Sequence, residues 1–193
     1  MRFDAIALAP QNADEFLRTA PLVTHVRRTF AAPADQVWEI VAGSRMWSWL
    51  PTVWGSRYPR AIDPAPGVVR DFQMHIFKWL IFAQHERLLE FDPAQMMMSY
   101  TATDATLPVF GSWCEHYRVE PENNGHATVD WTLACAPRYL RRIPGIRWGL
   151  RPVAAVLQPV FHFGLGGLER DLSRTPRAIT APPREPRTEK DPQ

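Results

Sequence analysis

Hydrophobic and polar positions divide the chain into strand-like and helix-like segments. Residues 22–30 are rich in β-branched side chains and predict a strand that ends just before Pro33. Pro33 suits the first turn of a helix with one apolar face, which Gly43 closes. A second short helix is predicted over residues 44–50, because the apolar pattern continues until Pro51.

Six further strand-like runs follow, separated by turn-forming Pro, Gly, Asp and Asn residues. The runs cover residues 53–60, 68–75, 80–91, 95–103, 111–120 and 127–135. Residues 121–125 between the last two read as a hairpin turn. Strands at hairpin spacing predict an antiparallel sheet.

The two ends of this region carry helical patterns. Residues 149–173 have apolar positions on one helix face and predict a single long helix, kinked at Pro159. Residues 12–19 predict a short helix, with Asn12 as its N-cap and Glu15 as the capping-box partner. The whole order predicts an α+β fold: a seven-stranded curved antiparallel sheet wrapped around the long C-terminal helix, with two short helices after the first strand. One helix on a strongly curved sheet leaves a cavity, which is the expected ligand site.

Composition sets the domain limits and narrows the function classes. Residues 1–20 form an N-terminal extension, residues 21–174 one domain, and the Pro-, Arg- and Glu-rich residues 175–193 are expected to be disordered. A net charge of +2, from 22 basic and 20 acidic residues, gives no general attraction to nucleic acid.

Nothing in the composition points to a metal, a cofactor or an exported protein. Cys114 and Cys135 lack metal-ligand spacing and suit a reducing compartment. The first residues are too short an apolar run for a signal peptide, and no segment has the length and apolarity of a membrane span. We therefore expect a cytoplasmic protein without metal or cofactor.

Five short motifs, in order, resemble the START-related helix-grip (SRPBCC) superfamily and in particular its bacterial polyketide cyclase/dehydrase branch. They are Phe30-Ala31-Ala32-Pro33-Ala34-Asp35-Gln36-Val37-Trp38, Trp49-Leu50-Pro51, Gly67-Val68-Val69-Arg70, Glu86-Arg87-Leu88-Leu89-Glu90-Phe91-Asp92 and Leu107-Pro108. The resemblance implies the helix-grip fold and a lipid- or polyketide-like ligand, and it places Arg70 and Glu86 in the cavity. It supports the fold more than the activity, because one scaffold hosts carriers, receptors and enzymes.

Strand alternation extends the candidate site around these two residues. On the strand over residues 111–120, one face carries Trp113, Glu115 and Tyr117, while His116 and Arg118 lie on the other. The candidate catalytic residues are Arg70, Glu86 and Tyr117. The candidate ligand-binding residues are Phe72, Met74, Gln84, Leu88, Tyr100, Trp113, Glu115, Leu157, Phe161 and Leu165.

Two interpretations of the charged residues stay open. Arg70 with Glu86 or Glu115 would orient a ligand carbonyl or hydroxyl, and a desolvated carboxylate suits a general acid or base. The alternative, which we favour, is a structural salt bridge inside the cavity. His162 on the long helix is a weaker candidate for proton transfer, because a histidine on a helix flank is more often solvated.

The sequence therefore supports a binding module for a hydrophobic small molecule, with a cyclase, dehydratase or aromatase as the alternative. A hormone-receptor function is disfavoured, since residues 76–79 are short and bulky rather than a glycine-bearing gate. The arginine-rich residues 138–151 fit a solvated face better than a membrane contact. The glycines at 164, 166 and 167 are expected to allow close packing of the helix. No oligomeric state is predicted.

Overall fold

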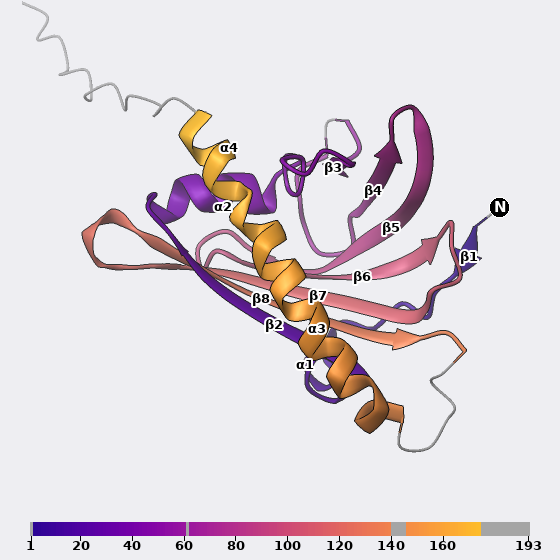
Figure 1. Ribbon diagram of the computed structural model, residues 1–193. Helices are drawn as coiled ribbons and strands as arrows, with labels where there is room; N and C mark the ends of the chain where they lie inside the picture. Colours follow the sequence, from indigo (N-terminus) through magenta and orange to yellow (C-terminus); the bar gives the residue numbers. More distant parts are fainter. Residues whose placement is uncertain (1, 61, 140–145, 175–193) are drawn as a thin grey trace, which may run out of the picture.

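A computed structural model describes residues 2–60, 62–139 and 146–174, without the side chains of residues 146–149, 151, 157 and 174. Its single sheet has the strand order β2-β8-β7-β6-β5-β4-β3, and every neighbouring pair is antiparallel (Figure 1). The strands are β1 (Phe3–Asp4), β2 (Leu22–Phe30), β3 (Val53–Arg57), β4 (Val69–Ile76), β5 (Trp79–Asp92), β6 (Met97–Ala105), β7 (Phe110–Pro121) and β8 (Ala127–Pro137). The seven predicted strands are all present, and the short β1 joins them by pairing with β6. The predicted disordered tail lies outside the described residues.

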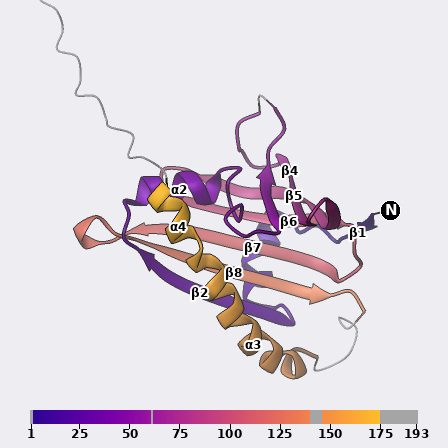
Figure 2. The ribbon, with the colours of Figure 1, turned by 45° about the horizontal axis from the view of Figure 1, so that its top comes forward.

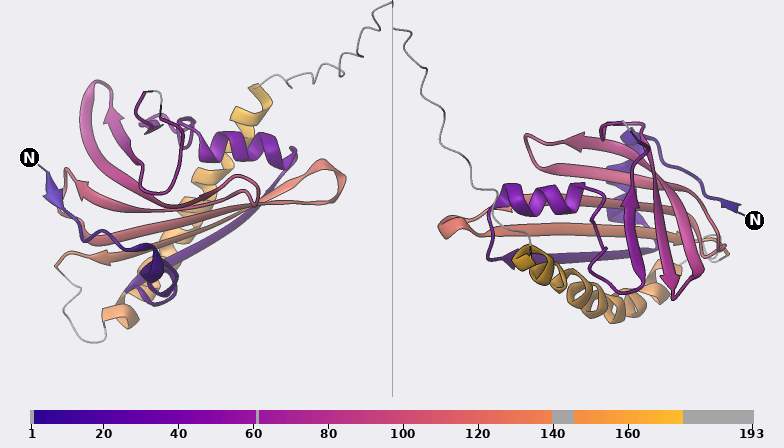
Figure 3. Two further views of the ribbon diagram at one scale, coloured as in Figure 1. Left: turned by 180° about the vertical axis from the view of Figure 1, so that it is seen from behind. Right: turned by 90° about the horizontal axis from the view of Figure 1, so that it is seen from above.

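The curled sheet has helices on both faces, which Figures 2 and 3 show from several sides. The helices are α1 (Pro10–Thr19), α2 (Ala34–Ala42), α3 (Ile146–Gly166) and α4 (Leu168–Arg174), with a short 3₁₀ turn at Asn123–Gly125. On the concave face, α2 packs against β7 and β8 and α3 runs beside β2. On the convex face, Ala13 of α1 packs with Leu89 and Cys114 in a small second core. None of the described helices is both long and apolar enough to cross a bilayer.

The predicted second short helix is wrong, because residues 43–52 form consecutive turns instead. Backbone N–H groups bond three residues back, as from Ser48 to Arg45 and from Leu50 to Trp47. Trp47 has a φ of 63°, which interrupts any α-helical run. This conformation turns the Trp47 side chain into the core, so tertiary packing overrides the local helical pattern.

The caps and breaks of the helices also differ from the prediction. Helix α1 begins at Pro10, and its N-cap is Ala9 rather than Asn12, because a proline in the first turn has no N–H to be capped. The single helix predicted over residues 149–173 is two helices, because α3 continues through Pro159 and is interrupted at Gly167.

Gly167 marks the close approach of the C-terminal helix to Trp49. A Cβ on Gly167 would lie 2.4 Å from Cδ1 of Trp49, whose Nε1 donates to the Gly164 carbonyl at 2.9 Å. The glycines therefore permit the close packing that the sequence predicts.

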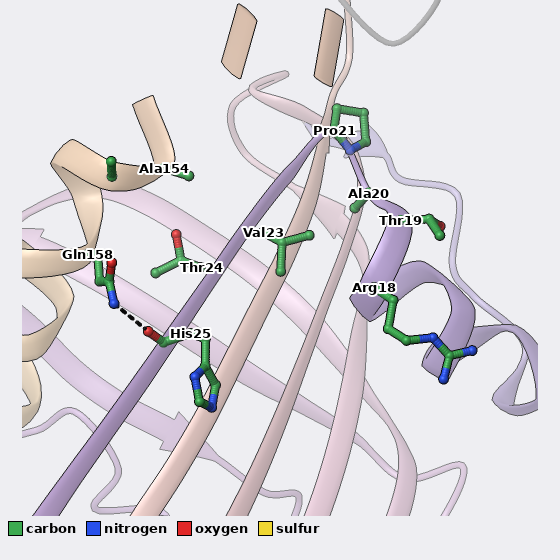
Figure 4. A pocket seen from close by; sticks show the side chains of 10 residues that line it. Arg18, Thr19, Ala20, Pro21, Val23, Thr24, His25, Ala154 and Gln158 are labelled. Atoms are coloured by element: carbon green, nitrogen blue, oxygen red, sulfur yellow. Dashed lines mark hydrogen bonds between the residues drawn. The ribbon is translucent and has the colours of Figure 1, made fainter. Parts of the chain in front are cut away.

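The outer edge of β2 lies against α3. The Gln158 side chain donates from Nε2 to the carbonyl of His25 at 3.1 Å (Figure 4), and Arg28 donates to the carbonyl of His162 at 3.3 Å. These hydrogen bonds link α3 to the edge strand β2. The centre of the concave face is lined by other side chains.

Candidate functional site

A cavity of about 400 Å³ lies between the concave face of the sheet, the turns after α2 and helix α3. Its wall is mainly aromatic and aliphatic, with a few polar groups from β5, β6 and β7. The lining residues are Trp47, Leu50, Val53, Phe72, Met74, Phe82, Gln84, Glu86, Tyr100, Trp113, Glu115, Trp131, Leu133, Val160, Phe161, Phe163 and Gly164. Val160 and Phe163 are also exposed to solvent, so the cavity opens beside α3.

The structure brings most of the predicted site residues to this wall. Those that line it are Phe72, Met74, Gln84, Glu86, Tyr100, Trp113, Glu115 and Phe161. Arg70, Leu88, Tyr117 and Leu165 are buried behind the wall rather than part of it. The side chain of Leu157 lies outside the described ones. Arg70 and Tyr117 therefore do not face the cavity themselves, and each contacts a carboxylate that does: Arg70 contacts Glu86, and Tyr117 contacts Glu115.

Arg70 forms a buried ion pair with Glu86. Its Nε donates to Glu86 Oε2 at 2.7 Å, and β4–β5 pairing places the two residues directly opposite each other. Burial alone would lower the pKa of Arg70, but the charge of Glu86, the neighbouring Tyr58 and Tyr100 and the hydrogen bond to Glu86 together outweigh it and raise the pKa, so the guanidinium stays cationic. Arg70 also lies 4.3 Å from the ring centre of Tyr100 and donates to the hydroxyl of Tyr58 at 3.0 Å. The pair is thus embedded in partners that satisfy it.

Glu115 collects hydrogen bonds from three ring groups. Trp113 Nε1 donates to its Oε1 at 2.8 Å, while Tyr117 OH and Trp131 Nε1 donate to its Oε2 at 2.6 and 2.7 Å. Burial, and then the charge of Glu86, raise the pKa of Glu115 to about 7 against the opposing effect of these donors. A carboxyl group that titrates near neutral pH therefore lines an apolar cavity.

Two phenol rings connect the charged groups. Tyr100 and Tyr117 stack at 6.2 Å between ring centres, and Tyr117 stacks in turn on Trp131 at 5.5 Å. Burial raises the pKa of both tyrosines well above its ordinary value, so both stay neutral hydrogen-bond donors. The polar groups of the cavity form one connected network rather than isolated points.

The sequence interpretation missed several wall residues. Trp131 and Leu133 follow from the hairpin, because the pairing of Pro121 with Ala127 sets Tyr117 opposite Trp131. That register was readable from the 121–125 turn. Phe82 shares the strand parity of Gln84 and Glu86 and was also readable from alternation, whereas Trp47 carries no such signal, since a turn of positive φ brings it to the wall.

The histidines lie away from the cavity. His85 bonds to Asp71 and Asp104 at 2.9 and 2.7 Å on the outer side of the sheet, and His75 stacks on Trp54. His162 is exposed, so the proton-transfer role considered for it has no support from its position. Within the described part of the chain, no group of three or more His, Cys, Asp and Glu side chains is placed to hold a metal ion.

A second hollow, of about 460 Å³, lies between α1, β2 and α3 (Figure 4). Its residues include Arg18, Thr24 and Gln158, and it has neither an aromatic wall nor a buried ionisable group. The internal cavity is therefore the better candidate site, although the outer hollow is the larger of the two.

Comparison with known proteins agrees with the fold. Residues 22–173 match the family described as polyketide cyclase / dehydrase and lipid transport. The chain belongs to this family. A search of curated protein sequences finds no match.

Several proteins of solved structure share this fold. The Zhui aromatase/cyclase from Streptomyces sp. R1128 is 20% identical with a TM-score of 0.57, covering 82% of this chain and 99% of its own. A START superfamily protein from Mycobacterium smegmatis is 14% identical with a TM-score of 0.58, covering 78% and 97%. A protein from Thermobifida fusca is 26% identical with a TM-score of 0.57, covering 79% and 93%. These likenesses establish the START-like helix-grip fold predicted from the sequence.

Proposed function

We propose that this protein binds a hydrophobic, lipid- or polyketide-like small molecule in its internal cavity. The observation that carries the proposal is the cavity wall itself, in which aromatic and aliphatic side chains surround about 400 Å³. Removing apolar ligand surface from water contributes roughly 25 cal/mol per Å², so such a wall supplies affinity without any reaction. The description of the family, polyketide cyclase / dehydrase and lipid transport, agrees with this class of ligand.

Native mass spectrometry of freshly purified protein tests the proposal directly. We expect a co-purified apolar molecule that is lost on denaturation. Binding of 1-anilinonaphthalene-8-sulfonate, a flat aromatic dye, provides a second readout. Absence of both a co-purified molecule and dye binding would remove the proposal.

A cavity-filling variant shows whether the dye occupies this cavity. Met74→Trp replaces a linear thioether on the cavity wall with a bulkier indole ring. Ile76→Trp on the same strand enlarges a side chain that is already exposed. We expect Met74→Trp to weaken dye binding at least tenfold and Ile76→Trp to leave it unchanged. Equal affinity in the two variants would place the dye elsewhere.

A cyclase, dehydratase or aromatase is the second candidate function. It is favoured by one observation, the pKa of about 7 at Glu115, because a general acid or base works best with a pKa near the operating pH. The hydrogen bonds from Trp113, Tyr117 and Trp131 weigh against it, since they occupy the carboxyl oxygens. The aromatase/cyclase of similar fold supports an enzymatic function only by analogy.

Dehydration of 4-hydroxy-4-phenylbutan-2-one to benzylideneacetone and water tests this second candidate. The reaction needs one base to remove the proton beside the carbonyl and one acid to protonate the leaving hydroxyl. We expect a catalysed rate that falls at least a hundredfold in Glu115→Gln if the cavity is catalytic. No catalysed rate in the unaltered protein, or equal rates in both proteins, would count against an enzyme of this class.

A further inference from the structure

Gln84 presents an unpartnered acceptor at the cavity wall. It is 3% exposed, and its Nε2 donates to Glu86 Oε1 at 2.5 Å. Its Oε1 is fully buried and has no hydrogen-bond partner among the described residues. Most buried polar atoms in folded proteins are paired, so this oxygen requires an explanation.

The Arg70–Glu86 ion pair fixes the orientation of the Gln84 amide. A carboxylate only accepts hydrogen bonds, so the Gln84 amide must turn its NH₂ group toward Glu86. The amide oxygen is then left as the end without a partner. Rotating the amide by 180° would set two acceptors against each other.

No donor of the described residues lies within hydrogen-bond distance of this oxygen. Its neighbours along β5 and across to β4 are Phe82 and Phe72, which are apolar. The ring donors of Trp113, Tyr117 and Trp131 all point to Glu115 instead. A bound molecule is therefore the group best placed to satisfy Gln84.

We infer that the ligand of this cavity is an apolar molecule carrying a hydroxyl group that donates to Gln84 Oε1. The inference rests on the proposed binding function and narrows its ligand class to phenols and alcohols. A buried acceptor left unpaired costs about 1–3 kcal/mol, so the cavity discriminates against an otherwise identical molecule without the donor.

A matched pair of probes tests the inference: 2-naphthol has the donor, and 2-methoxynaphthalene has the same rings without it. Calorimetric titration is carried out on the unaltered protein, on Gln84→Met and on the control Gln73→Met, whose side chain bonds to His75 on β4 and does not line the cavity. We expect naphthol to bind about tenfold more tightly than the ether to the unaltered protein and to Gln73→Met, and that preference to vanish in Gln84→Met.

The outcomes separate this inference from the proposed function. Equal affinity of both probes for the unaltered protein, or a preference retained in Gln84→Met, overturns the role of Gln84 while cavity binding stands. Failure of both probes to bind overturns the two together. Binding of the ether in Gln84→Met at unaltered affinity shows that the variant keeps an intact cavity.

A second inference rests on a different observation, the large apolar side chains exposed at one end of the sheet. Antiparallel pairing brings the β4–β5 turn, the β6–β7 turn and the end of β8 to the same end (Figure 1). There Phe77 is 93% exposed, Trp79 67% and Tyr139 74%. Their exposed apolar neighbours at this end are Ile76, Leu80, Leu107 and Val109.

The opposite end of the sheet is polar by comparison. Its β7–β8 turn has the sequence Glu122-Asn123-Asn124-Gly125-His126, and its β5–β6 turn includes Ala94 and Gln95. Apolar exposure on this scale at only one end indicates an interaction surface rather than a general property of the chain.

The charges at the apolar end identify the partner. Lys78 lies between Phe77 and Trp79, and Arg138 precedes Tyr139, while residues 76–81, 106–109 and 138–139 contain no acid. Exposed aromatic rings interleaved with cations suit the boundary between acyl chains and anionic headgroups. The cavity-wall residues Met74 and Phe82 lie on the same hairpin as Phe77 and Trp79. A partner bound at this end of the sheet is therefore close to the cavity.

We propose that this end of the sheet docks on an anionic lipid bilayer. Co-sedimentation with vesicles of 70% phosphatidylcholine and 30% phosphatidylglycerol tests it. We expect the unaltered protein to sediment with these vesicles and a Phe77→Asn/Trp79→Ser double variant to lose at least tenfold in partitioning. Asparagine suits the φ of 52° at Phe77, so the turn is retained.

The matched control removes exposed apolar side chains elsewhere. Ile62 and Val69 are 49% and 39% exposed away from this end, and Ile62→Ser/Val69→Ser is expected to sediment as the unaltered protein does. Equal sedimentation of all three proteins, or none by the unaltered protein, overturns the proposal. A protein partner in place of a bilayer would give the second of these results.

Discussion

Arg70 Nε and Glu86 Oε2 lie 2.7 Å apart in the interior, and neither side chain has more than 1% of its surface exposed. We predict that Arg70→Met lowers the free energy of unfolding by about 3–5 kcal/mol, because it leaves the Glu86 charge buried without its partner. Urea denaturation measures the change.

The double variant Arg70→Met/Glu86→Gln separates loss of the charge pair from loss of packing. Removing both charges is expected to recover more than half of the lost stability. If the double variant is as unstable as the sum of the two single variants, the pair does not act as a unit.

Glu115 makes stability depend on pH. Its pKa is raised from 4.5 to about 7 on folding, so between these values the folded protein holds a proton that the unfolded chain has released. Stability from this group is present below pH 4.5 and is lost as the pH rises to 7, by roughly 3 kcal/mol. The difference in unfolding free energy between the unaltered protein and Glu115→Gln, measured from pH 5 to 8, reports this effect alone. A constant difference over that range would mean that Glu115 has an ordinary pKa.

The break between α3 and α4 depends on Gly167. We predict that Gly167→Ala destabilises the protein by about 1–3 kcal/mol, because its Cβ would meet the Trp49 ring at 2.4 Å. At Gly166 the nearest atoms belong to the guanidinium of Arg28, at 2.7 Å, which is the far end of a flexible side chain. Gly166→Ala is therefore expected to cost less. Thermal denaturation compares the two, and equal losses would show that Trp49 moves aside as easily as Arg28.

Both cysteines are expected to be unreactive in the folded protein. Cys114 and Cys135 are buried free thiols, and burial raises the pKa of each to about 12, which removes the thiolate that reacts. Titration with 5,5′-dithiobis(2-nitrobenzoic acid) should modify them only after addition of denaturant. Rapid modification at pH 8 without denaturant would contradict the burial of at least one thiol.

Local periodicity predicted the strands and much of the cavity wall. Because side chains alternate along a strand, the wall positions of Phe72 and Met74 followed from the face of the sheet assigned to Arg70, and that of Gln84 followed from Glu86. The convergence on Glu115 was beyond such reasoning, since Trp131 reaches it from a neighbouring strand.

The errors in the prediction arise where distant contacts decide local structure. The 44–50 segment has a helical pattern, yet its backbone is set by the contacts of Trp47 with Trp131 in the core and by the hydrogen bond from Trp49 to α3. The apolar pattern predicts one helix over residues 149–173, but it is interrupted at Gly167, where the glycine faces Trp49. Neither outcome is encoded within a few residues of the site.

The hydrogen bonds from Gln158 and Arg28 between α3 and the edge strand β2 have a consequence for association of the protein. An open sheet edge is a template on which strands of other chains add, and this sheet never closes into a barrel. Helix α3 obstructs one such template, and the other edge is the short, irregular β3. A molecule that opens widely enough to admit a greasy ligand is thereby protected from polymerising through its own backbone.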